Sequence, residues 1–87
     1  MSTPEGFEGV DVDEATVEVI RANDAEVKRL SSELAKGGTD AEQVRLAAEL
    51  VNASRRQEGV LSEVPGLETR GRALGETRAE LERSYDL

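Results

Sequence analysis

The chain has 87 residues, which is room for one small domain. It contains no cysteine and no histidine, which excludes disulfide bonds, thiolate or imidazole metal ligands, and the nucleophile–histidine pairs of many hydrolases. Charged residues make up 34% of the chain, the net charge is −8, and the aromatic residues are Phe7 and Tyr85 alone. Ordinary enzyme chemistry is therefore largely excluded, and a core of valine, leucine, isoleucine and alanine is expected.

Residues 1–12 are an acidic arm with neither helical nor strand periodicity, and an extended conformation is expected for them. Five of the first 14 residues are acidic and none is basic, so much of the negative charge gathers at this end. Asp11 and Asp13 are both candidate N-caps for a first helix. Asp11 also precedes Glu14 by three residues, which is the spacing of a capping box.

The first predicted helix spans about residues 13–36. Its apolar residues recur three, four and seven positions apart, which places them on one face: Val17, Ile20, Val27, Leu30 and Leu34. Asp24 and Lys28 stand four residues apart in the order that favours an ion pair on a helix. Gly37 and Gly38 follow, and glycine is the residue that commonly ends a helix.

The second predicted helix spans about residues 40–64 and begins with a capping box formed by Thr39 and Glu42. Its apolar residues fall on two adjoining faces that together cover more than half of its circumference. The remaining polar face contains five residues: Arg45, Glu49, Asn52, Arg56 and Glu63. Such a helix is expected to pack between two neighbouring helices.

The third predicted helix spans about residues 67–85, after a break at Pro65-Gly66. Three leucines are spaced by seven, with one aromatic residue close to the same line, in a coiled-coil-like pattern: Leu67, Leu74, Leu81 and Tyr85. This line of residues either belongs to the core of its own chain or forms a seam with another chain. The sequence leaves both alternatives open.

Gly71 and Gly75 lie inside the third helix, where each costs about 1 kcal/mol of helix stability relative to alanine. Their spacing allows two helix backbones to approach closely, although that motif is diagnostic only in an apolar membrane segment. The glycines are therefore either tolerated in a weak helix or the site of a close crossing with a partner helix.

The locally basic stretch, residues 54–72, contains four arginines: Arg55, Arg56, Arg70 and Arg72. Three glutamates in the same stretch leave a net charge of only +1, and aromatic residues for stacking on bases are missing from it. Binding to nucleic acid is not expected, and solvated arginines or salt bridges to a protein are favoured.

The sequence predicts an all-α protein, either an antiparallel helical hairpin or a small three-helix bundle, with residues 13–87 as one small domain behind the arm. Because the core is small, an oligomer or a protein partner is expected to complete the fold. The expected function is that of a non-enzymatic structural or assembly subunit, with a small virus or phage particle component as the first sub-class. The alternative is a regulatory inhibitor, or an antitoxin-like protein, whose acidic arm blocks a basic site on its target.

Partner contacts are predicted at eight residues: Phe7, Asp11, Asp13, Leu67, Gly71, Leu74, Leu81 and Tyr85. We predict no catalytic residue, cofactor, metal ion or small-molecule substrate. Neither a signal peptide nor a transmembrane segment is apparent, so the cytoplasm or a virion is the expected location and a membrane partner is not expected.

Overall fold

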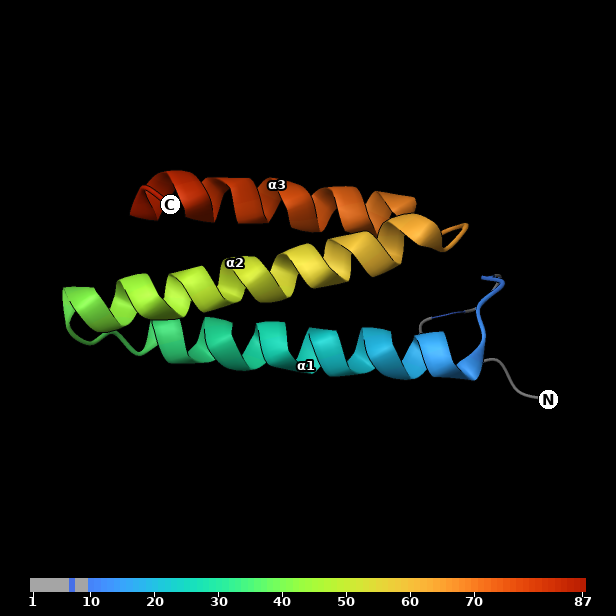
Figure 1. Ribbon diagram of the computed structural model, residues 1–87, viewed down its shortest axis with the longest axis horizontal. Helices are drawn as coiled ribbons and strands as arrows, with labels where there is room; N and C mark the ends of the chain where they lie inside the picture. The colour runs from blue at the N-terminus through green and yellow to red at the C-terminus, as the bar shows by residue number, and fades with distance from the viewer. Residues whose placement is uncertain (1–6, 8–9) are drawn as a thin grey trace.

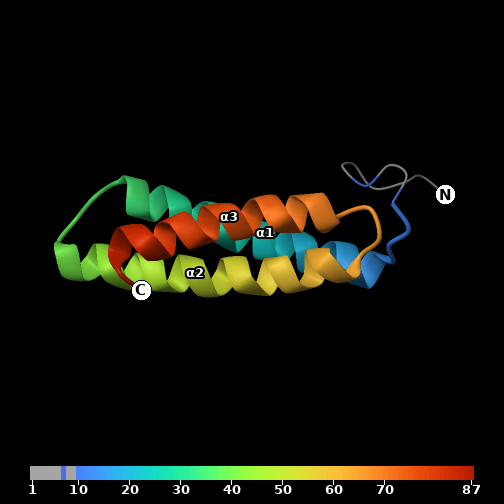
Figure 2. The ribbon, with the colours of Figure 1, turned by 90° about the horizontal axis from the view of Figure 1, so that it is seen from above.

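A computed structural model of the chain describes residue 7 and residues 10–87. The protein is all-α, and its three helices, α1 (Glu14–Ala35), α2 (Asp40–Glu63) and α3 (Glu68–Tyr85), pack as a small bundle. The predicted fold class is confirmed, and each helix begins and ends within one residue of its predicted bounds. Figure 1 shows α2 between α1 and α3 in an elongated molecule of 48 × 19 × 15 Å. The turned view in Figure 2 shows that α1 and α3 run in one direction and α2 in the other.

Side-chain caps define the starts of α1 and α2. Of the two candidate caps for α1, Asp13 is the N-cap, and its Oδ1 accepts a hydrogen bond of 2.8 Å from the backbone N–H of Thr16. This hydrogen bonding lowers the pKa of Asp13. Asp11 lies two residues before the cap, so the predicted capping box of Asp11 with Glu14 does not start the helix. At α2, Thr39 Oγ1 accepts from the backbone N–H of Glu42 at 3.2 Å, as the sequence predicts.

The two connections reverse the chain direction at glycines. Gly37 (φ +82°) and Gly38 (φ +140°) follow α1, and Gly66 (φ +97°) precedes α3. Only glycine adopts such positive φ values readily, which explains why the breaks stand at these positions. On α1, the predicted ion pair of Asp24 with Lys28 is present at 3.1 Å.

The core consists of two clusters along the axis of the bundle. The first lies where the arm meets the helices and contains Phe7, Val17, Ile20, Leu61, Val64 and Leu67. The second lies toward the link between α1 and α2, and contains Leu30, Leu50 and Ala53. Helix α2 packs against α1 on one side and α3 on the other, which confirms the expectation of two neighbours. All five residues of its predicted polar face are exposed.

Candidate protein-binding groove

Phe7 lies inside the core of its own chain. Its side chain is only 4% exposed and belongs to the first core cluster. The guanidinium of Arg70 lies 5.9 Å from the centre of the ring, within the range of a cation–π interaction. A role for Phe7 in a partner's pocket stays a prediction, but in this structure the ring already fills a pocket formed by its own chain. The rest of the acidic arm before residue 10 is outside the described residues.

The leucine line of α3 faces the core of the same chain. Leu67 is 2% exposed, Leu74 packs against the first cluster and Leu81 packs against the second. Tyr85 is half-buried. Of the two alternatives that the sequence leaves open, the structure thus shows the intrachain one. Asp11 and Asp13, by contrast, are exposed at the start of α1.

The two glycines of α3 lie at a close crossing with α2. A Cβ atom on Gly71 would lie 3.2 Å from Cβ of Leu61 and 3.6 Å from the backbone oxygen of Glu58. A Cβ atom on Gly75 would lie 2.7 Å from Oε1 of Glu58. The missing side chains therefore allow α2 and α3 to approach closely, and the helix that meets the glycines belongs to the same chain.

A cluster of charged side chains continues this contact along α3. Arg78 donates hydrogen bonds to Glu58 of α2 and to Glu82 of α3, and Arg55 reaches Glu82 at 3.4 Å. Hydrogen bonds to these two carboxylates raise the pKa of Arg78, and the hydrogen bond from Arg78 lowers the pKa of Glu82. Because this cluster pairs opposite charges across α2 and α3, it orients the two helices but leaves little free charge for a partner.

The four arginines of the basic stretch have different neighbours. Arg55 contacts Glu82, Arg70 stacks over Phe7, and Arg72 lies beside Glu58 and Glu68 in a shallow depression. Arg56 is exposed on the polar face of α2. The fold thus distributes these charges instead of collecting them into one phosphate-binding surface.

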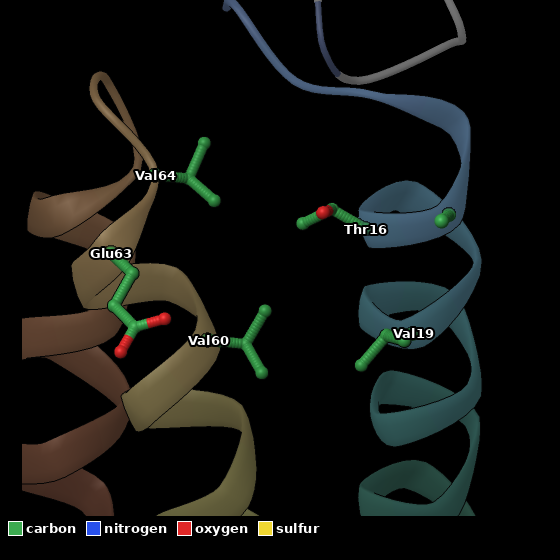
Figure 3. A pocket seen from close by; sticks show the side chains of 6 residues that line it. Thr16, Val19, Val60, Glu63 and Val64 are labelled. Atoms are coloured by element: carbon green, nitrogen blue, oxygen red, sulfur yellow. The ribbon is translucent and has the colours of Figure 1, made fainter.

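The first turns of α1 and the last turn of α2 leave an apolar depression open, which we call the valine groove. It has a volume of about 390 Å³ and six lining residues: Ala15, Thr16, Val19, Val60, Glu63 and Val64. Figure 3 shows Val19 and Val60 pointing toward one another across it. Val19 is 47% exposed, which is high for a large aliphatic side chain beside other apolar side chains.

Sequence reasoning missed Val19. It lies at the edge of the apolar face of α1, because it is eleven residues, or about three helical turns, before Leu30. Val60 and Val64 belong to the apolar faces of α2, but the periodicity of α2 alone cannot show that Val60 stays partly exposed. The available signal was an apolar residue four positions after Ala15 and next to the predicted apolar stripe of α1.

We call the end of the groove near the start of α1 and the C-terminal end of α2 its open end, and acidic residues stand close to it in the sequence. Asp13, Glu14 and Glu18 are exposed on the first turns of α1 and at its N-cap, and Glu63 lines the groove from α2. The last turn of α2 contains no basic residue. Helix C-termini carry partial negative charge and favour cations, so Glu63 adds negative charge where the helix already has it.

An ion pair lies farther along α1, beyond the residues that line the groove. Arg29 donates to Glu26 at 2.6 Å on α1, and this hydrogen bond, together with the charges of Arg29 and of Arg56 on α2, lowers the pKa of Glu26. The valine groove is thus a mainly apolar surface whose one charged lining residue among those described is Glu63.

Within residues 10–87 and at Phe7, no group of three acidic side chains is placed to hold a metal ion. In the same part of the chain, each helix is too short or too polar to cross a bilayer. The chain matches no protein-family model, no curated protein and no solved structure.

Proposed function

We propose that this protein is a non-enzymatic structural or assembly subunit that binds another protein through the valine groove. The observation that carries the proposal is the exposure of Val19, which faces Val60 across an open apolar depression. What distinguishes Val19 from the similarly exposed Val44 is that it lies beside further apolar side chains in a depression, and contiguous exposed apolar surface favours an interaction site.

The burial of Phe7 favours this function over inhibition by the arm. An arm that inserts its aromatic side chain into a target must first release that side chain from its own core, and burying a phenylalanine stabilises a fold by about 1.5–3 kcal/mol. The valine groove needs no such rearrangement. Within the class of assembly subunits, a small component of a virus or phage particle fits the size of the chain and its lack of histidine and cysteine.

The test compares two matched substitutions, Val19→Glu in the groove and Val44→Glu on α2. Val44 is 44% exposed, nearly the same as Val19, but it is not among the residues that line the groove. Tagged variants are expressed in the source cells, and the fraction of each that enters a large complex is measured by size fractionation. We expect Val19→Glu to reduce that fraction about tenfold or more, and Val44→Glu to leave it unchanged.

Far-UV circular dichroism of both purified variants shows whether they keep the helical content of the parent. If the Val19→Glu variant is folded and enters complexes as well as the parent does, the groove is not the binding surface and the proposal is wrong.

A further inference from the structure

We infer that the occupant of the valine groove is a basic amphipathic helix of a different protein. This inference rests on the proposed function, because it names the class of partner that the same groove takes. It is carried by the shape of the groove, the charges at its open end and the poor fit of a second copy of this chain.

The shape of the groove fits a helix. It lies between two antiparallel helices and extends over about one turn of each, from Ala15 to Val19 on α1 and from Val60 to Val64 on α2. Side chains of a third helix, spaced three or four residues apart, pack into such a seam. Helix α3 packs on another side of α2, so α2 already has one helical neighbour besides α1.

The charges at the open end select a basic partner. Glu63 lies in the last turn of α2, where the helix dipole disfavours a negative charge and where no basic residue compensates it. Glu14 and Glu18, which precede the lining residues Ala15 and Val19 in α1, are exposed and add negative charge to this end of the bundle. A lysine or arginine next to the apolar positions of the partner helix therefore gains attraction from side chains and from the dipole together.

A second copy of this chain is a poor occupant. A symmetric dimer brings the same surface of both subunits together, so it would place two Glu63 side chains and no basic lining residue in one interface. The net charge of −8 adds a general repulsion between copies.

The test uses two synthetic helical peptides that share leucines four residues apart and differ only in their flanking residues, which are lysines in one and glutamates in the other. Each is titrated into the full-length ¹⁵N-labelled protein, and binding is followed by NMR. We expect the lysine peptide to shift the amide signals of Ala15, Val19 and Val60, and to bind at least about tenfold more tightly than the glutamate peptide. The affinity of the lysine peptide should fall as salt is added.

Charge-reversed variants sharpen this test. Glu63→Lys should lower the affinity for the lysine peptide about fivefold or more and raise the affinity for the glutamate peptide. Glu80→Lys is the matched control, because Glu80 is exposed on α3 and does not line the groove. The control should bind both peptides as the parent does.

Two results would overturn the inference. One is equal binding of both peptides, or no shift at the groove with either. The other is concentration-dependent self-association in ultracentrifugation that Val19→Glu abolishes, which would make a second copy the occupant. If no peptide binds but Val19→Glu still prevents entry into the large complex, the partner class is wrong and the assembly function stands. If neither effect occurs, both proposals are wrong.

Discussion

On its α1 side, helix α2 buries aliphatic side chains, and on its α3 side it approaches two glycines and a cluster of charges. Ile20 and Leu30 of α1 are 2% and 1% exposed. The buried Gln57 of α2 adds a hydrogen bond of 2.9 Å from its Nε2 to the backbone oxygen of Ile20. Helix α1 thus depends mainly on apolar area, which is non-directional and tolerant of small shifts.

Helix α3 contributes one fully buried residue of its own, Gly71, and holds its position by close backbone approach and by the ion pairs of Arg78. A close helix contact depends on the exact shape of the two surfaces, and an ion pair depends on pH. Apolar burial depends on both less strongly. One small bundle thus combines a robust hairpin, α1 with α2, and a third helix that we expect to separate more easily.

Replacing Ile20 by alanine should destabilise the whole chain. Ile20 belongs to the first core cluster, so the substitution leaves a cavity between α1 and α2. Such cavities lower the free energy of unfolding by about 2–5 kcal/mol. Urea denaturation followed by circular dichroism measures the free energy of unfolding. Val44→Ala is the control, because the exposed Val44 should contribute little. A loss for Ile20→Ala no greater than that of the control contradicts the central role of the α1 contact.

Gly71→Leu should displace α3 and leave the hairpin of α1 and α2 in place. The new side chain meets Leu61 and the backbone of α2, and overpacking of this kind costs about 1–3 kcal/mol. Relative to the parent protein, the substitution should accelerate amide hydrogen exchange more in α3 than in α1. Gly59→Ala is the control, since nothing lies within 4 Å of its added methyl group, and it should stabilise α2 by up to about 1 kcal/mol. Equal acceleration of exchange in all three helices would show that α3 does not separate independently.

Gln57→Met should leave the protein as stable as the parent or stabilise it by up to about 1 kcal/mol. The Oε1 atom of Gln57 is buried and has no hydrogen-bond partner among the described residues, and methionine removes that unpaired acceptor. The hydrogen bond to Ile20 is lost at the same time, which limits the gain. Thermal unfolding of both proteins measures the difference. A loss larger than about 1 kcal/mol would show that the hydrogen bond outweighs the unpaired oxygen.

Arg78→Met should give the smallest change in the free energy of unfolding, and that change should depend on pH. The hydrogen bond from Arg78 lowers the folded-state pKa of Glu82, so this stabilisation is present above the ordinary glutamate pKa of about 4.3 and is lost as pH falls through the lowered value. The variant should therefore be less stable than the parent at neutral pH and approach it in acid. Urea midpoints of both proteins across this range test the effect. A difference that is constant with pH would mean that Arg78 acts by packing.

The sequence alone determined the helices, their ends and the faces that they bury. These features arise from residues close together in the chain. Thr39 caps the helix that begins at the next residue, glycine ends α1, and a periodic apolar stripe places Val17 and Ile20 on one side of α1. Because such interactions span only a few residues, their geometry follows from local spacing.

Tertiary structure alone decided which surfaces meet. The leucine line and Gly71 could have met another chain, and Phe7 could have remained outside the core, but each packs within its own chain. The valine groove likewise depends on how α1 lies against α2, since Val19 and Val60 are far apart in the sequence. Helical periodicity states which face is apolar, whereas the neighbour that covers that face, or leaves it open, depends on the packing of the whole bundle.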